Sequence, residues 1–213
     1  INEIGEVVPG KYPLLEPFAT KGLAMVSDSA FFMATSEGVL SCRASERKIK
    51  RKKILDNRTY ALEYDSNLHK LWAGGVDSLF VCDMDGECEP APFGNASRHL
   101  ITEVAIGENG KVWATTMGAG VYCWDGQNLQ QFTSDSGLLS DLTTSLYLVG
   151  NDTVWIGSDL GLTCLVDATN NPQFLHFTAA FGLAGNYVTD VTQVGKEVWV
   201  AAVPLFEHDA FFA

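Results

Sequence analysis

The chain has little positive charge, no long apolar run and no familiar cysteine or histidine motif. It holds 14 Lys and Arg residues against 26 Asp and Glu, which gives a formal net charge of -12 and a pI near 4.6. Such a chain lacks the extended basic surface that binds a polyanion, so we expect no nucleic-acid partner. The one basic run, at residues 47–53, is expected to be a solvated hairpin.

No apolar stretch reaches the roughly 18 residues that cross a bilayer, so we expect no membrane insertion of this segment. The sequence does not begin with Met and carries no recognisable signal peptide. We therefore expect either a processed chain or a part of a longer one. The missing signal does not argue for the cytoplasm.

The motifs of catalysis and metal binding are also missing. The five cysteines form no CxxC pair, and no Cys/His cluster has the spacing of metal ligands, so we predict neither a metal nor a cofactor. There is no Gly-x-Ser-x-Gly elbow and no phosphate loop, and the four histidines belong to no motif. We predict no catalytic residue, and we expect the chain to bind rather than to catalyse.

The sequence does contain an internal repeat. Five segments align, and each carries an aromatic anchor at the same place: Phe32, Trp72, Trp113, Trp155 and Trp199. Successive anchors are 40, 41, 42 and 44 residues apart, and four of the five tryptophans occupy this position. A fixed period of this length is the signature of a repeat architecture.

Each repeat has the pattern of four short strands. Around Trp155, strand-like segments at 145–149, 153–157, 162–166 and 174–177 are separated by turns rich in Gly, Asn and Asp. Four strands in about 40 residues are typical of a propeller blade. We therefore predict an all-β fold, a single β-propeller domain or propeller fragment with about five visible blades. The predicted blades are 23–57, 58–96, 97–138, 139–183 and 184–213.

The repeat also predicts packing. A large aromatic fills the widening space between blades, so all four repeat tryptophans are expected to be buried. Cys42, Cys82 and Cys123 follow their anchors by ten residues, and we expect cysteines at such separate positions to be buried free thiols. An Asp-Gly turn brings Cys88 near Cys82 and allows a disulfide there. Residues 12–18 are expected to close the last blade as an outer strand.

The linkers between blades carry a resemblance to a known family. Residues 132–138 and 177–183 share the pattern Phe-Thr-x-x-x-Gly-Leu, and each precedes a Val-Trp segment. The repeat resembles the two-component regulator propeller repeat, found in the periplasmic sensor regions of bacterial hybrid histidine kinases, especially in gut Bacteroidetes. The match is strong over 97–200 and weak over 22–57, where Phe replaces Trp. Family sensors usually carry two seven-bladed propellers, more than the blades visible in this sequence.

The resemblance implies a non-catalytic module on the periplasmic or extracellular side of a bacterial envelope. The leading interpretation is the sensing region of a two-component regulator that binds a small molecule or an oligosaccharide. A second is a cell-envelope scaffold or assembly protein that uses the propeller to hold another envelope protein. A third is a propeller hydrolase or lyase. The resemblance also allows a homodimer of the parent protein.

A ligand site is predicted where the inner strands begin, because inner strands line the central channel of a propeller. The polar residues that open these strands are Arg58, Arg98, Asp141 and Asn186. His99 and Tyr187 follow two of them, and turns bearing Asp77, Met117 and Asp159 are expected to reach the same mouth. Two arginines can grip the carboxylate or sulfate of an acidic sugar through forked hydrogen bonds. The alternative is that these polar groups only satisfy turn backbones.

Overall fold

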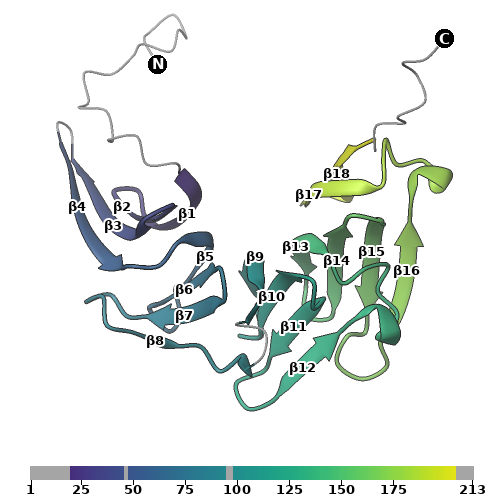
Figure 1. Ribbon diagram of the computed structural model, residues 1–213, viewed down its shortest axis with the longest axis horizontal. Coiled ribbons are helices and arrows are strands. Elements are labelled where there is room, and N and C mark those ends of the chain that lie inside the picture. The colour runs from purple at the N-terminus through teal and green to yellow at the C-terminus, as the bar shows by residue number, and fades with distance from the viewer. Residues whose placement is uncertain (1–19, 46–47, 95–97, 205–213) are drawn as a thin grey trace, which may run out of the picture.

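Strands and turns make up almost all of this protein. The computed structural model describes residues 20–45, 48–94 and 98–204. Four four-stranded antiparallel sheets and one two-stranded sheet follow one another along the chain. Figure 1 shows them as an arc of blades around a common centre, which confirms the predicted all-β propeller.

The blades are numbered in chain order. Blade 1 comprises β1 (Thr20–Ser27), β2 (Ala30–Thr35), β3 (Gly38–Ser45) and β4 (Lys48–Leu55). Blade 2 comprises β5 (Thr59–Asp65), β6 (Lys70–Gly75), β7 (Ser78–Cys82) and β8 (Cys88–Pro90). Blade 3 comprises β9 (Leu100–Ile106), β10 (Val112–Met117), β11 (Val121–Trp124) and β12 (Leu129–Phe132). Blade 4 comprises β13 (Thr143–Val149), β14 (Thr153–Ser158), β15 (Gly161–Val166) and β16 (Gln173–Phe177), and blade 5 comprises β17 (Tyr187–Val194) and β18 (Glu197–Val203).

In every blade the first strand is innermost, and later strands lie progressively farther from the centre (Figure 1). Short 3-10 turns at Ser134–Ser136 and Ala179–Phe181 carry the chain from an outermost strand back to the next innermost one. These turns fall in the linkers whose repeated sequence carried the family resemblance. The linker pattern therefore marks the passage from one blade to the next.

The hydrophobic core is divided into layers between successive blades. Trp113 and Phe132 of blade 3 pack with Leu146 and Ile156 of blade 4. Equivalent layers join blades 1 and 2, blades 2 and 3, and blades 4 and 5. A four-stranded sheet has two apolar faces, and stacking against neighbours on both sides removes them from water.

In blades 1, 3 and 4 the turn between the second and third strands needs glycine. At Gly120 the backbone has φ of +69°, and a Cβ there would lie 2.1 Å from the carbonyl oxygen of Phe132. Gly38 and Gly161 occupy the same turn in blades 1 and 4, also with positive φ and a close carbonyl oxygen. Any side chain would meet both steric and backbone strain there. This requirement explains the glycine that opens the third strand in these repeats.

One repeat tryptophan is not buried as the repeat predicts. Trp72 and Trp113 are 6% and 3% exposed, and Trp155 is half-buried, but Trp199 is 60% exposed. The expectation that all four tryptophans are buried is wrong for Trp199. Its surroundings all come from its own blade, and no described strand of another blade covers that face.

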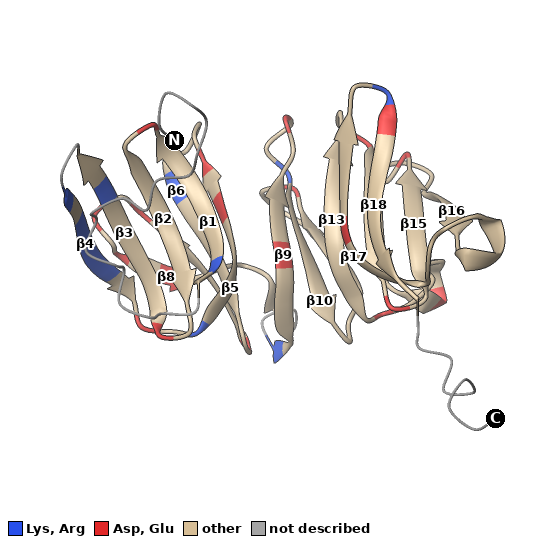
Figure 2. Cartoon of the chain, turned by 90° about the horizontal axis from the view of Figure 1, so that it is seen from above, with Lys and Arg blue, Asp and Glu red and all other residues tan. Residues whose placement is uncertain are grey.

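The free-thiol expectation is confirmed for Cys42 and Cys123 and wrong for Cys82, which takes up the disulfide that the Asp-Gly turn allows. Cys82 and Cys88 form a disulfide across the β7–β8 hairpin, whereas Cys42, Cys123 and Cys164 are buried free thiols. Burial raises the pKa of the Cys123 thiol to about 12. The basic run forms the exposed outer strand β4, as Figure 2 shows in blue. The predicted closing strand at 12–18 lies outside the described residues.

Candidate functional site

A β-bulge recurs at the same place in every innermost strand. At this place the strand pairing skips one residue in each of β1, β5, β9, β13 and β17, and β1 has a second irregularity at Val26. The skipped residues are Lys21, Tyr60, Thr102, Thr144 and Thr189. A bulge breaks the strict alternation of side chains and can aim one of them in a new direction.

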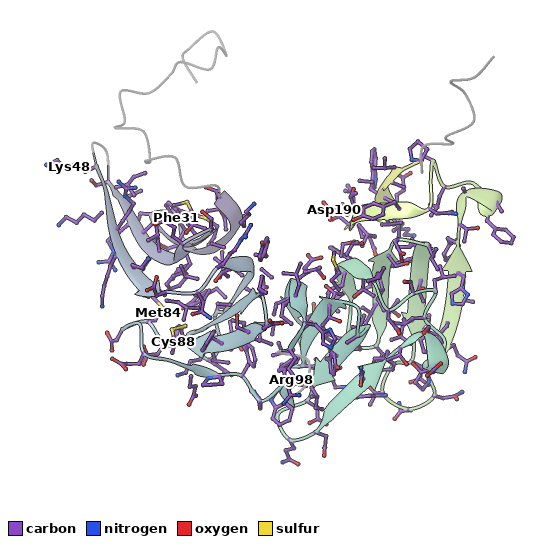
Figure 3. The ribbon with its side chains drawn as sticks, in the orientation of Figure 1. Phe31, Lys48, Met84, Cys88, Arg98 and Asp190 are labelled. Carbon is purple, nitrogen blue, oxygen red and sulfur yellow. A yellow bond between two sulfur atoms is a disulfide. The ribbon has the colours of Figure 1, made fainter. Side chains whose placement is uncertain are left out.

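All five bulge residues line one cavity of about 400 Å³, which we call the channel cavity. It lies among the innermost strands, and Asp190, another of its lining residues, is seen on the inner side of the arc in Figure 3. A second cavity of about 250 Å³, the mouth cavity, shares Tyr60 and the three bulge threonines and adds Leu100, Met117 and Tyr187. The two cavities therefore share residues at the centre of the arc, where the channel cavity is mainly polar and the mouth cavity mainly apolar.

Tyr60 is the aromatic member of the bulge set. Its half-buried ring lies 5.2 Å from Arg58 Cζ and 5.7 Å from Lys21 Nζ, measured to the ring centroid. Cations at this distance are attracted to the ring face and restrict its position. The Tyr60 hydroxyl makes no hydrogen bond to any described residue, so it can bond a ligand.

Two of the three bulge threonines tie neighbouring blades together, whereas Thr189 Oγ1 donates to the Ala201 carbonyl oxygen of its own blade. Thr102 Oγ1 donates to the carbonyl oxygen of Thr143 at 3.0 Å, and Thr144 Oγ1 donates to that of Val188 at 2.6 Å. Beside them Ser145, only 2% exposed, has an Oγ without a hydrogen-bond partner among the described residues. The site thus combines bonded hydroxyls, which can still accept, with the hydroxyls of Tyr60 and Ser145, which bond no described residue.

Carboxylates make the channel cavity acidic. Glu103 Oε2 accepts a hydrogen bond from the Leu146 backbone N–H at 2.7 Å. Burial raises the pKa of Glu103 to about 7, against the lowering effect of that hydrogen bond, and the charges of Asp190 and Glu63 raise it further. Burial also raises the pKa of Glu63, with a further contribution from Asp65. Crowded, partly desolvated carboxylates resist ionisation together.

Two of the predicted site residues hold the linkers in place. Asp141 Oδ1 accepts the Ser134 backbone N–H, and Asn186 Oδ1 accepts that of Ala179, both at 2.7 Å. Each side chain therefore caps the 3-10 turn that precedes its own inner strand. These two side chains therefore bond the backbone of a turn, as the alternative to a ligand-binding role predicts.

The remaining predicted residues are spread over the mouth and the rim. Tyr187 lines the mouth cavity, and exposed Arg58 lies against Tyr60. Asp77 is exposed in its turn, His99 is half-buried near Gly118, and Asp159 is half-buried with an unbonded Oδ1. Exposed Arg98 lies on the outer side of the arc in Figure 3, away from Asp190. Neither described cavity is lined by Arg58, Asp77, Arg98, His99, Asp141, Asp159 or Asn186.

The side chains that do line the channel lie two to four residues after the predicted positions. A signal for them was present in the sequence, because a threonine recurs near the start of three inner strands, at Thr102, Thr144 and Thr189. The bulge that directs these side chains inward depends on strand pairing. A pattern of strict alternation cannot locate it.

Solved structures with a similar fold include three bacterial propellers. The chain aligns with the extracellular domain of a putative hybrid two-component system from B. thetaiotaomicron at 17% identity and TM-score 0.71, covering 88% of this chain and 26% of that one. It aligns with PorZ, a surface component of the type-IX secretion system of Porphyromonas gingivalis, at 18% identity and TM-score 0.61, covering 84% of this chain and 31% of PorZ. It aligns with a gluconolactonase from Xanthomonas campestris at 15% identity and TM-score 0.62, covering 87% of this chain and 70% of the gluconolactonase.

These likenesses establish the propeller fold. The chain spans about a quarter of the sensor domain and about a third of PorZ. No family model and no curated protein sequence matches it. Within the described residues there is no helix long and apolar enough to span a membrane, and no cluster of three or more His, Cys, Asp or Glu that could hold a metal.

Proposed function

We propose that this chain is the ligand-binding part of an extracytoplasmic sensor propeller and that its channel cavity binds a sugar without acidic groups. The observation that carries the proposal is the β-bulge shared by all five innermost strands. It directs one side chain per blade, Lys21, Tyr60, Thr102, Thr144 or Thr189, into a single cavity. Convergent polar groups around an aromatic ring are the usual composition of a small-molecule site.

Two observations support an extracytoplasmic location. The Cys82–Cys88 disulfide suits an oxidising compartment, because cytoplasmic thiols are normally kept reduced. The structural likeness extends to an extracellular sensor domain and to a bacterial surface component. We infer from both that the chain works on the periplasmic or extracellular face of an envelope.

The chemistry of the cavity favours a neutral or amino sugar. The Tyr60 ring can stack on the apolar face of a pyranose, and the hydroxyls and carboxylates can bond its hydroxyl groups. Glu63, Glu103 and Asp190 outnumber the one cation of the cavity, Lys21. Above the Glu103 pKa of about 7 these carboxylates would repel an acidic sugar, so the proposal replaces the acidic ligand expected from Arg58 and Arg98.

Calorimetric titration with uncharged oligosaccharides and their carboxylated or sulfated counterparts tests this proposal. We expect an uncharged sugar to bind, and Tyr60→Ala to weaken its binding by about tenfold or more, equivalent to roughly 1.4 kcal/mol. Phe181→Ala is the matched control, because that ring is 79% exposed and far from the cavity lining. Circular dichroism establishes that both variants keep the fold.

Three outcomes would overturn the proposal. If Arg58→Ala/Arg98→Ala abolishes binding while Tyr60→Ala does not, the ligand sits at the arginines. If none of the sugars binds, the scaffold interpretation is favoured. If the sugar is consumed during the titration, the chain is an enzyme, as the similar gluconolactonase is.

A further inference from the structure

The β3–β4 hairpin of blade 1 carries a row of cations on one face. Lys48, Lys50 and Lys52 lie at alternate positions of β4, so their side chains share a face. Arg43 on β3 lies directly opposite Lys50. Lys52 Nζ donates to the Asp85 carbonyl oxygen of blade 2 at 3.0 Å, so this face is turned toward blade 2. We call these four residues the basic face.

The positive charge of the basic face is not neutralised within the described part of the chain. Like charges directly across a strand pair are unfavourable, and Arg43 and Lys50 form such a pair. The salt bridge found among the described residues joins Lys53 and Asp56, and Lys53 points to the other face of β4. Asp83, in the facing turn of blade 2, uses its carboxylate on the N–H groups of that turn. In a protein of net charge -12, this concentration of cations calls for an acidic partner.

A cavity of about 310 Å³ adjoins the basic face, and we call it the basic notch. Its lining includes Val26, Phe32 and Met84 together with Arg43, Lys50 and Lys52. Met84 is 43% exposed and lies in the turn that the Cys82–Cys88 disulfide closes. Figure 3 shows Lys48 and Met84 on the outer part of the first two blades, across the arc from Asp190. The notch is therefore separate from the channel cavity.

No described strand pairs with the outer edge of β4, the strand beside the notch, and this edge is unusually long. β4 is the outermost strand of its blade and has eight residues, whereas β8, β12 and β16 have three, four and five. An outermost strand presents unpaired backbone N–H and C=O groups on one side. Lysines on such an edge repel apolar or basic strands, but they attract an acidic one.

We propose that a partner protein docks on blade 1 by adding an extended acidic segment to the free edge of β4. Strand addition aligns every second side chain of the segment with one face of the sheet. Carboxylates at alternate positions would then meet Lys48, Lys50 and Lys52, which have the same two-residue spacing. An apolar side chain on the same face of the segment enters the basic notch.

Fluorescence anisotropy with a labelled peptide, Glu-Thr-Glu-Thr-Glu-Thr-Leu-Thr, tests the proposal on the full chain. We expect this peptide to bind, and a peptide of the same composition with its three Glu residues consecutive to bind about tenfold more weakly or worse. Lys50→Glu/Lys52→Glu should weaken binding of the alternating peptide by at least about tenfold, through charge repulsion. Lys196→Glu, an exposed position in the β17–β18 turn, is the control and should leave binding unchanged.

The alternatives give different results. If the rearranged peptide, or one methylated at alternate backbone nitrogens, binds as tightly as the first, charge alone acts and strand addition is wrong. If vesicles of equimolar phosphatidylcholine and phosphatidylglycerol bind while the peptide does not, the occupant is a membrane surface and the proposal fails. Circular dichroism of the variants shows whether they are folded. Sugar binding by the variants, measured separately, shows whether the channel site is intact.

Discussion

Blades 3 and 5 carry the same anchor in different surroundings. Trp113 and Trp199 both lie on the second strand, opposite Ala105 and Thr192 of the innermost strand. Trp113 stacks on Phe132 at 5.8 Å and is covered by blade 4, whereas Trp199 is 60% exposed. The repeat places the tryptophan, but a neighbouring blade is needed to bury it. The same residue therefore has a different energetic role at the centre and at the end of the arc.

The largest effect is expected from removing the two anchors. Trp113→Ala should lower the free energy of unfolding by about 3–5 kcal/mol, because it leaves a cavity in a closed layer. Trp199→Ala should lower it by less than about 1 kcal/mol, because little buried contact is lost. Urea unfolding of both variants measures the difference. Equal losses would show that blade 5 is covered in solution, and the comparison would then no longer hold.

Replacing Gly120 or Gly195 by alanine should give a smaller difference in stability between an inner blade and blade 5. Gly120→Ala should cost about 2–3 kcal/mol, because positive φ is combined with a carbonyl oxygen 2.1 Å from the new Cβ. Gly195, in the β17–β18 turn, also has positive φ but no atom within 4 Å of the new Cβ, so Gly195→Ala should cost about 1 kcal/mol. Thermal unfolding of the two variants tests this order. A larger loss at Gly195 would mean that the open blade is as tightly constrained as the inner one.

The smallest of the effects expected in the inner blades concerns the carboxylate between blades 3 and 4. The folded-state pKa of Glu103, about 7, lies above its ordinary value of 4.5, so the folded state binds the proton more tightly. Stability should therefore fall as pH rises from about 4.5 to 7 and change little from this group above that. The loss is about 2 kcal/mol once partial exposure of the side chain is allowed for.

Glu103→Gln should remove this part of the pH dependence, since the amide oxygen can still accept the Leu146 N–H. Denaturant midpoints measured from pH 4 to 8 give the profile. Glu197→Gln, exposed on β18 of the open blade, is the control and should leave the profile unaltered. If the stability of Glu103→Gln depended on pH as that of the wild type does, the Glu103 carboxylate would have the same pKa in the folded and unfolded states.

The repeat predicts only part of the candidate ligand site. Most of the predicted residues lie at the start of the inner strands, and Tyr187 does line the mouth cavity. Asp141 and Asn186 instead cap linker turns, because each side-chain oxygen accepts a hydrogen bond from the backbone N–H seven residues earlier. Local sequence shows that a residue is polar, but it does not show whether a nearby backbone group already satisfies it.

The sequence by itself determined the blade. Its period, its anchor aromatics and the glycines of its turns act over a few neighbouring residues, and short-range sterics and strand pairing suffice to specify them. Tertiary structure alone decided which anchors are buried, because burial requires a second blade. It also decided that the bulges turn Tyr60 and the three threonines toward one cavity. Those results depend on the register between strands and on the packing of whole sheets, which residue patterns do not encode.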